Sequence, residues 1–286
     1  MKIQKLPENK FPKAFSEIPQ PPKHLWTIGE LPPENLIHLC VVGSRKFTSY
    51  GRDACEKIIA GLKGYPIVIV SGLALGIDAI AHKKALEVGL KTLVFPGSGL
   101  SPEAMHPKTN AKLAEDVVKS GGCLISELPP YFKATLWSFG RRNRLMAGIS
   151  KAVLIIEAEE RSGTLITARL ATEYNRDLLA VPGSIFSPNS KGTNRLLHQG
   201  ATPVTCAEDV LEALGFELPK EKEKQAKLFL DLSPEEKKVV DLLREPIPRD
   251  DLIRAMKLPT PTTNAILSVM EIKELIKEEL GEIRLA

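Results

Sequence analysis

A switch from strand to helix through two glycines, in residues 67–82, constrains the fold of this chain more than any other feature. Residues 67–70, Ile-Val-Ile-Val, are β-branched and apolar without polar alternation, which is typical of a parallel strand covered on both faces. Gly72 and Gly76 permit a tight turn, and the apolar spacing becomes helical from Ile77. The segment therefore predicts one strand–turn–helix unit of an α/β sheet.

The turn after this strand is also a candidate anion site, because backbone N–H groups at a glycine turn and at a helix N-terminus lack partners of their own. A turn that holds no ligand is the alternative. The spacing matches neither Gly-x-Gly-x-x-Gly nor a P-loop with Gly-Lys-Ser/Thr, so it gives no direct support to dinucleotide or nucleoside-triphosphate binding. We expect no cofactor and no metal ion.

The same unit repeats roughly every 25 to 30 residues, which is typical of a parallel sheet with helices on both faces. The sequence predicts strands over 39–42, 67–70, 91–95, 123–126, 152–157 and 178–181, and helices over 51–62, 77–88, 110–119, 165–175 and 195–199. Leu25, Trp26 and Ile28 are predicted to add an edge strand. The predicted fold class is therefore α/β, with a Rossmann-like parallel sheet.

Length and proline placement predict four parts. At 286 residues the chain is long enough for one large α/β domain and a small second one. We expect a proline-rich arm packed on the core over 1–35, the sheet domain over 36–215, a charged linker over 216–230 and a winged-helix-like domain over 231–286. The last expectation rests on predicted helices over 234–244, 249–256 and 262–275, followed by a hairpin over 276–285 with its turn at Gly281.

The charges are unevenly distributed along the chain. Lys and Arg exceed Asp and Glu by 39 − 35 = 4 overall, whereas residues 219–286 carry 13 basic and 14 acidic side chains, which leaves 26 − 21 = +5 for residues 1–218. An anion-binding face therefore belongs to the larger part. For the acidic tail, contact with another protein or simple packing is favoured over binding in a DNA groove.

Four cysteines, at positions 40, 55, 123 and 206, form no Cys-x-x-Cys pair, and we expect buried free thiols in a reducing compartment. No apolar run approaches the ~20 residues of a membrane span, and the N-terminus has no apolar signal-peptide core. We therefore expect a soluble, cytoplasmic protein without a membrane partner.

An aromatic and basic cluster follows the strand over 123–126. Residues 131–144 are predicted to form a long loop that combines Tyr131, Phe132, Trp137 and Phe139 with Lys133, Arg141, Arg142 and Arg144. Arginines bind phosphate oxygens and aromatic rings stack on unpaired bases, so the combination is typical of a single-strand nucleic-acid surface. An aromatic mini-core with solvated arginines is the alternative.

Small polar and basic residues recur where predicted strands end, at Ser44 and Arg45, at Gly72, and in segments 162–164 and 191–194. Hydroxyl groups at the start of a helix either cap that helix or bind phosphate, and the sequence does not separate these roles. In an open parallel sheet, the loops after the carboxyl ends of the strands line one crevice. We therefore expect these loops to form a single site.

Several ordered motifs point to a known family. They are Val-Gly-Ser-Arg at 42–45, the strand–turn–helix segment at 71–82, Phe-Gly-Arg-Arg-Asn-Arg at 139–144, Glu-Arg-Ser-Gly-Thr-Leu-Ile-Thr-Ala at 160–168, Val-Pro-Gly-Ser at 181–184 and Lys-Gly-Thr-Asn-Arg at 191–195. Over roughly residues 11–214 the chain resembles the bacterial DNA-processing protein A (DprA/Smf) family, and the tail resembles the family's winged-helix appendage. The family usually has proline where this chain has Gly140, which predicts a more mobile loop.

The resemblance implies a Rossmann-like domain that forms a homodimer, binds and protects single-stranded DNA, and loads the RecA recombinase on it during natural transformation, without catalysis of its own. By matching motif, it implies a DNA pocket made by Ser44, Arg45, Gly72, Phe139, Arg141, Arg142, Asn143, Arg144, Ser162, Gly163, Thr164, Lys191, Gly192, Thr193 and Asn194.

Two other functions remain open. One is a nucleoside-monophosphate phosphoribohydrolase of the lysine-decarboxylase-like fold, although the turn over 161–164 lacks the paired glycines and the following glutamate of those enzymes. Its conceivable acids and bases would be Asp78, Glu157, Glu173, His82 and His106. The other is a sequence-specific repressor, which would need a basic helix over 262–275, where the chain offers Lys273 against Glu271 and Glu274.

Overall fold

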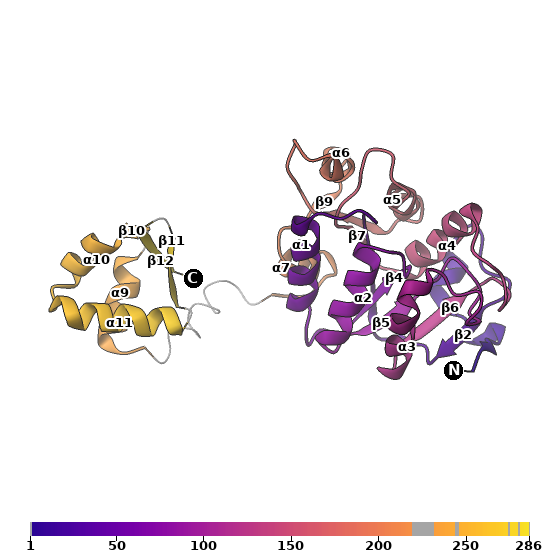
Figure 1. The fold of residues 1–286 in the computed structure, drawn as a ribbon, viewed down its shortest axis with the longest axis horizontal. Helices are drawn as coiled ribbons and strands as arrows, with labels where there is room; N and C mark the ends of the chain where they lie inside the picture. Colours follow the sequence, from indigo (N-terminus) through magenta and orange to yellow (C-terminus); the bar gives the residue numbers. More distant parts are fainter. Residues whose placement is uncertain (1, 219–231, 244–245, 274, 280, 286) are drawn as a thin grey trace. The chain divides into compact units, whose positions relative to one another are not determined.

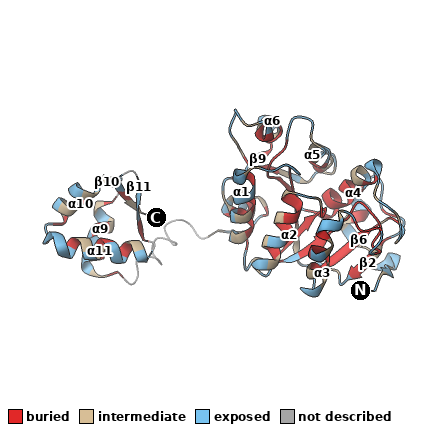
Figure 2. Cartoon of the chain, viewed as in Figure 1, coloured by how far each residue is buried: buried red, intermediate tan, exposed pale blue. Residues whose placement is uncertain are grey.

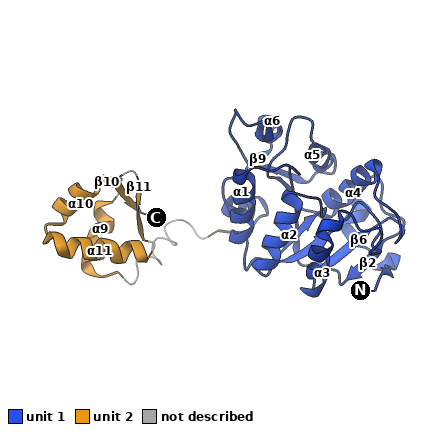
Figure 3. Cartoon of the chain, viewed as in Figure 1, with its two compact units in different colours: residues 1–217 blue, residues 218–286 orange. Residues whose placement is uncertain are grey.

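The computed structural model describes the chain except for residues 1, 219–231, 244–245, 274, 280 and 286. The chain divides into two compact units, Met1–Glu217 and Leu218–Ala286, shown in different colours in Figure 3. Most of the predicted linker, residues 219–230, lies outside the described residues.

The first unit is built on a mostly parallel sheet with helices on both faces (Figure 1). Its strands are β1 (Gln4–Lys5), β2 (Trp26–Gly29), β3 (Ile37–Val42), β4 (Ile67–Ser71), β5 (Lys91–Val94), β6 (Cys123–Ser126), β7 (Ala152–Ile155), β8 (Asp177–Ala180) and β9 (Thr202–Pro203). Among the described residues their order across the sheet is β1-β2-β6-β5-β4-β3-β7-β8-β9. The strands from β6 to β9 in this order run parallel, and β1 and β2 are antiparallel additions, so the predicted α/β class is confirmed.

The helices follow the strands in chain order. They are α1 (Ser49–Gly61), α2 (Ile77–Glu87), α3 (Ala111–Lys119), α4 (Leu136–Ile149), α5 (Thr164–Glu173), α6 (Lys191–His198) and α7 (Ala207–Ala213), with short 3-10 turns η1 (Glu8–Lys10), η2 (Lys13–Glu17), η3 (Lys108–Asn110) and η4 (Pro188–Ser190). Side chains of α2 and α3 pack with Val94 and Leu124 on one face, and those of α4 and α5 pack with Leu93 and Ile125 on the other. Helices therefore cover both faces of the sheet.

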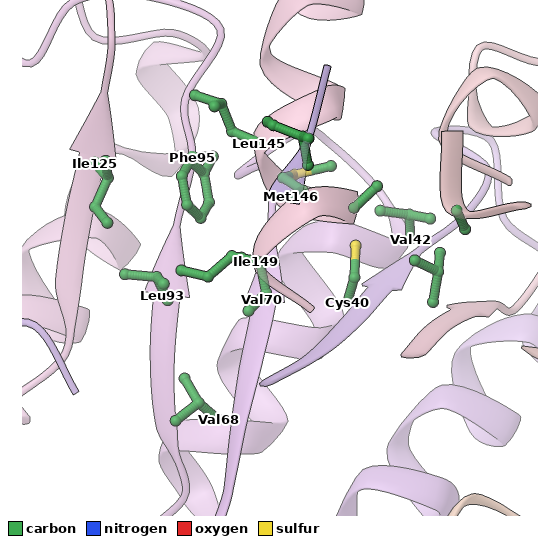
Figure 4. Packing of buried hydrophobic residues seen from close by; sticks show 14 of the residues in the cluster. Cys40, Val42, Val68, Val70, Leu93, Phe95, Ile125, Leu145, Met146 and Ile149 are labelled. Atoms are coloured by element: carbon green, nitrogen blue, oxygen red, sulfur yellow. The ribbon is translucent and has the colours of Figure 1, made fainter. Parts of the chain in front are cut away.

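All five residues of β4 are buried, as an apolar run without alternation predicts for a central strand (Figure 2). On one face, Val68 and Val70 of β4 pack with Leu145, Met146 and Ile149 of α4 (Figure 4). Helix α4 therefore helps to close the core, and its position is held by apolar burial.

The structure corrects the prediction of a long loop over 131–144, because α4 begins at Leu136. The backbone N–H of Thr135 donates to Ser138 Oγ at 3.0 Å, which satisfies a group at the helix N-terminus that would otherwise lack a partner. Gly140 lies inside this helix, where a Cβ atom would meet nothing within 4 Å, so it does not make a mobile loop. The Thr-x-x-Ser spacing at 135–138 is the sequence signal for this helix start, and the loop prediction overlooks it.

Other predictions need smaller corrections. Strand β2 is not at the edge of the sheet, since β1 pairs outside it. Helix α6 begins at Lys191, which places the predicted loop over 191–194 in its first turn. Cys206 is only half-buried, whereas the other three cysteines are buried as expected.

The second unit is a winged helix. It contains α9 (Pro234–Leu242), α10 (Arg249–Met256), α11 (Thr260–Ile272), β10 (Ile247–Pro248), β11 (Ile276–Glu279) and β12 (Glu282–Leu285). The three strands form a small antiparallel sheet, and Val239, Leu252 and Leu267 bring the three helices into one core. Ser233 and Glu236 form the predicted capping box at the start of α9, with bonds of 2.8 and 3.2 Å. The predicted end of this helix at position 244 lies outside the described residues.

The N-terminal arm packs into the core of the first unit. Phe15 is 2% exposed, and its ring lies edge-on to Phe95 with the centroids 6.4 Å apart. Ile18 packs against Gly148 of α4, where a Cβ atom would lie 2.7 Å from the isoleucine side chain. The arm is therefore part of the apolar core.

Phe15→Ala should lower the free energy of unfolding by about 3 to 5 kcal/mol, because it leaves a cavity between the arm and the sheet. The matched control is Lys13→Ala on the same turn, whose side chain is 87% exposed and whose removal should change stability by less than about 0.5 kcal/mol. Urea denaturation of both variants measures the difference. Equal, small effects would mean that the arm does not belong to the cooperative unit.

Candidate functional site

A pocket of about 500 Å³ opens where β3 and β7 lie side by side at their carboxyl ends. From β3 the chain proceeds to β4 on one side and returns as β7 on the other, so this boundary is the topological switch point at which open α/β sheets bind ligands. The pocket wall combines residues 42–46 after β3, Ala74 and Asp78 near the start of α2, side chains of α4, and residues 159–167 around the start of α5. We call it the first pocket.

An arginine and an aromatic ring face each other in the first pocket. The guanidinium of Arg45 lies 5.2 Å from the ring centroid of Phe139, within the range of a cation–π contact. The Phe139 ring packs against Gly97, where a Cβ atom would lie 2.4 Å from it, and its centroid is 5.7 Å from that of His106. The ring is thus held in place while the exposed Arg45 side chain stands beside it.

The backbone that carries Arg45 is held by its neighbours. The N–H of Ile77 donates to the Ser44 carbonyl at 3.2 Å. Gly76, with φ of 84°, makes this approach possible, since a Cβ atom there would lie 2.3 Å from the Ser44 oxygen. Asn189 Nδ2 donates to the Lys46 carbonyl at 2.6 Å on the other side. Arg45 is therefore presented by an anchored turn.

Two N–H groups of the turn over 72–76 already have a partner in the chain, which favours the alternative of a turn that holds no ligand. Gly72 N and Ala74 N donate to Asp78 Oδ2 at 3.1 and 3.4 Å. The anion at this turn is the chain's own carboxylate. Burial raises the pKa of Asp78, while the charge of Arg142 and the two backbone bonds oppose that rise.

Arg142 forms the buried end of the first pocket. It is 7% exposed, and its Nη1 donates to the Phe95 carbonyl at 2.6 Å. The guanidinium lies against Gly72, where a Cβ atom would be 1.5 Å from Nη1, so Gly72 is the residue that makes room for it. Burial lowers the pKa of Arg142, and the Asp78 carboxylate opposes that change.

Most of the predicted site residues meet in this pocket. Ser44, Arg45, Phe139, Arg142, Asn143, Ser162, Gly163 and Thr164 all line it. Thr164 Oγ1 donates to the Gly43 carbonyl at 3.1 Å and so ties α5 to the residue after β3, while Ser162 Oγ accepts from Thr164 N at 3.1 Å at the start of α5. Both side chains therefore make a structural hydrogen bond and also line the first pocket.

Two predicted arginines point to other partners. Arg141 is exposed, donates through Nε to Glu127 Oε1 at 2.9 Å and lies 5.8 Å from the centroid of the Trp137 ring. Arg144 is buried, pairs with Glu127 and donates to the Gln20 carbonyl at 2.5 Å. Neither lines the first pocket. Arg144 instead connects α4 to the N-terminal arm.

The segment 191–194 also lies outside the first pocket, so the prediction of one crevice for all the loops is wrong in this part. Thr193 Oγ1 donates to the Ser190 carbonyl at 3.1 Å, and the Asn194 amide exchanges bonds of 3.2 and 3.0 Å with the backbone of Gly183. Gly192 allows close packing, since a Cβ atom there would lie 2.6 Å from the Ala158 carbonyl. From the first turn of α6, these residues hold the loop that precedes the helix.

Of the conceivable catalytic acids and bases, Asp78 alone is among the residues that line the first pocket. Glu157 accepts from Thr48, and Glu173 pairs with Arg169 at 3.3 Å on the surface. His82 Nδ1 is 2.5 Å from Thr92 Oγ1, and burial lowers the pKa of His82 to about 3. His106 packs beside Phe139.

Sequence reasoning missed several wall residues of the first pocket, among them Lys46, Ala74, Leu136, Met146, Glu159 and Ile166. Lys46 directly follows Arg45, and this adjacency was a usable signal. Glu159 adds an exposed carboxylate to the wall, and no motif or spacing in the sequence indicates it. Over the described part of the chain, no cluster of three or more His, Cys, Asp or Glu side chains is arranged to hold a metal ion. No helix in that part is long and apolar enough to cross a membrane.

The chain matches two family models. Residues 2–215 match the model described as DNA recombination-mediator protein A, and residues 223–281 match the DprA winged helix domain. Over 197 residues the chain is 42% identical to Protein Smf of Escherichia coli, a match that covers 69% of this chain and 52% of that protein. Over 206 residues it is 40% identical to DNA processing protein DprA of Streptococcus pneumoniae, with 72% of each chain covered. The chain thus spans about half the length of the Escherichia coli relative.

Two solved structures share this fold. The X-ray structure of DNA processing protein A from Streptococcus pneumoniae has a TM-score of 0.69 and 38% identity, with 76% of each chain covered. DNA processing protein A from Helicobacter pylori, whose structure concerns its single-stranded DNA binding mode, has a TM-score of 0.66 and 30% identity. That match covers 74% of this chain and 95% of the Helicobacter pylori chain.

Arg142→Ala should lower the free energy of unfolding by about 1 to 3 kcal/mol, because it leaves the buried Phe95 carbonyl without its donor and removes the cation that favours the charged form of the buried Asp78. The neighbouring exposed Arg141→Ala is the matched control and should cost less than about 1 kcal/mol. Adding Asp78→Asn to Arg142→Ala should recover part of the loss, since the uncompensated charge is then absent. Denaturant unfolding of the set measures this coupling, and strictly additive losses would contradict it.

Proposed function

Because this chain belongs to the DNA recombination-mediator protein A family, which includes the DprA and Smf proteins, we propose that it binds single-stranded DNA in the first pocket. The observation that carries the proposal is the Arg45 guanidinium beside the held Phe139 ring at the switch point of the sheet. A cation for a phosphate and a ring for an unpaired base are the two elements that sequence-independent single-strand binding requires.

The charges of the first pocket support a phosphate close to Arg45. Arg45 and Lys46 are exposed basic residues, and Arg142 lies buried behind them. Asp78 is turned toward its own turn by two backbone bonds, which leaves Glu159 as the exposed carboxylate of the wall. The exposed cations Arg45 and Lys46 are therefore available to a phosphate. Because the Asp78 carboxylate already accepts from two backbone N–H groups, a binding role is favoured over acid–base catalysis.

The Helicobacter pylori relative, described for its single-stranded DNA binding mode, supports the same assignment for this chain. We place Ser44, Asn143, Ser162, Gly163 and Thr164 in the wall that contacts the strand, and Gly72 behind it as the support of Arg142. Outside the first pocket, the exposed Arg141 and Lys191 are proposed as further contacts for the strand, while Arg144 and residues 192–194 support α4 and the loop before α6.

We further propose that the protein forms a homodimer through its first unit, protects bound single strands and loads the RecA recombinase on them in transformation or recombination. The family description as a recombination mediator supports this role. Sedimentation of the purified protein tests the dimer, and nuclease digestion of a bound strand tests protection. ATP hydrolysis by RecA on single-stranded DNA should begin sooner when the protein is present; an unchanged lag would remove the loading role.

The protein should bind a single strand more tightly than a duplex of equal length and show little sequence preference, because stacking requires unpaired bases. Affinity should fall with salt by roughly 0.7 in log K per log unit for each phosphate neutralised. Fluorescence anisotropy with labelled oligonucleotides over a salt series measures both. Equal affinity for the duplex, or a flat salt response, would contradict the proposal.

Arg45→Ala should weaken binding of single-stranded DNA by about 1 to 3 kcal/mol, the loss of a charge-assisted bond from an anchored side chain. Its matched control is Arg52→Ala, another exposed arginine, which lies in α1 outside the first pocket. Phe139→Ala should cost about 1 to 3 kcal/mol for each base that the ring stacks on, with the salt slope nearly unchanged. Melting temperature and affinity are measured on the same preparations. A drop in melting temperature with intact affinity of the folded fraction would assign both residues to packing alone.

A further inference from the structure

A second pocket of about 540 Å³ lies beside the first. It is lined by Thr48 and Tyr50 at the start of α1, by Glu157 after β7, and by the loop over 182–190 before α6. Lys46 lines the first pocket and Thr48 lines the second. These residues are two positions apart, so their Cα atoms lie at most about 7 Å from each other. Asn189 binds the Lys46 carbonyl and ties the loop before α6 to this junction.

The second pocket differs from the first in its chemistry. None of its lining residues is basic, and its one ionisable acid is the Glu157 carboxylate, whose residue is 1% exposed. That carboxylate accepts from Thr48 N at 3.0 Å and from Thr48 Oγ1 at 2.5 Å. The remaining polar groups of the lining are backbone groups and the hydroxyls of Tyr50 and three serines. Such a wall disfavours a phosphate and suits an uncharged group with hydrogen-bond donors and acceptors.

Tyr50 gives this pocket a fixed aromatic ring. Its hydroxyl donates to the Pro182 carbonyl at 2.6 Å, across 132 positions of sequence, while 50% of the residue stays exposed. Burial first and the Glu157 charge second raise the pKa of Tyr50, so the hydroxyl remains a donor at neutral pH. A ring held at its far end loses little freedom when a ligand stacks on it.

The surroundings of the second pocket suit a continuing strand. Lys46 precedes Thr48 by two positions and Lys191 directly follows Ser190, and the bond from Asn189 to the Lys46 carbonyl brings the backbones of these two segments together, so both exposed lysines belong to one border of the second pocket. Ile185 and Phe186, which are 78% and 89% exposed, belong to the same loop. A wall without cations that borders on cations has the charge order of a base next to its phosphate.

We propose that the second pocket holds one unpaired nucleobase, stacked on Tyr50, of the same strand whose neighbouring phosphate is bound at Arg45. This inference rests on the proposed function and adds a base subsite to it. It also gives Lys191 a role, as a contact for a phosphate next to that base. The base is selected for its aromatic face and its uncharged polar edge, and the negative Glu157 keeps phosphates out of the pocket.

The test uses a hexathymidylate and six variants of it, each with one abasic position, so that the short strand limits sliding. For the full-length protein, one or two adjacent abasic positions should weaken binding more than the others. Tyr50→Ala should raise the Kd for the intact hexamer by about 5- to 150-fold, as expected for one lost stacking contact. The same variant should no longer respond to an abasic site at one of those positions.

Tyr50→Phe is the matched control, because it keeps the ring and removes only the bond to Pro182. It should retain most of the affinity and the abasic response, whereas Arg45→Ala should weaken all seven strands alike. Melting temperatures show that each variant is folded, which is expected for a half-exposed tyrosine. Unchanged affinity of Tyr50→Ala, or an abasic profile that Tyr50→Ala leaves intact, overturns the base subsite alone. Absence of single-strand binding by the unmodified protein removes the proposed function as well.

Discussion

The buried guanidinium of Arg142 is the contact on which the candidate site depends. It reaches from α4 to the Phe95 carbonyl of the β5 end and to the glycine turn after β4, and it compensates the charge of Asp78. Asp78 in turn holds that glycine turn through two N–H groups. Through these contacts Arg142 and Asp78 connect α4, the β4 turn and the start of α2. The position of the α4 wall that carries Phe139 therefore depends on them.

The alternation of strand, glycine turn and helix was enough to predict the fold class and most element positions. Apolar runs such as 67–70 have one good placement, in the centre of a parallel sheet. The position of α4 was missed because Phe139, Gly140 and three arginines suggested a solvated loop, although Leu145, Met146 and Ile149 have helical spacing. Local composition outweighed the weaker periodic signal in that segment.

The candidate site was predictable only in part, for a related reason. Residues directly after β3, such as Ser44 and Arg45, are placed by the sheet itself, so their convergence follows from topology. The directions of Arg141, Arg142 and Arg144 depend on which face of α4 each occupies and on partners distant in sequence, such as Glu127 and Gln20. The separation of 191–194 from the first pocket depends on bonds to Gly183 and Ser190 that no spacing reveals.

The pairing of β2 with β6 has a consequence for synthesis on the ribosome. Trp26 lies opposite Ser126, so 126 − 26 = 100 residues separate two partners in neighbouring strands. During translation the arm emerges early, and its apolar residues Phe15, Ile18 and Leu25 have no sheet to join until β6 has been made. An apolar segment that waits this long for its partner is exposed to premature association with other chains. Residues 15–25 are therefore exposed to such association throughout the synthesis of roughly the next hundred residues.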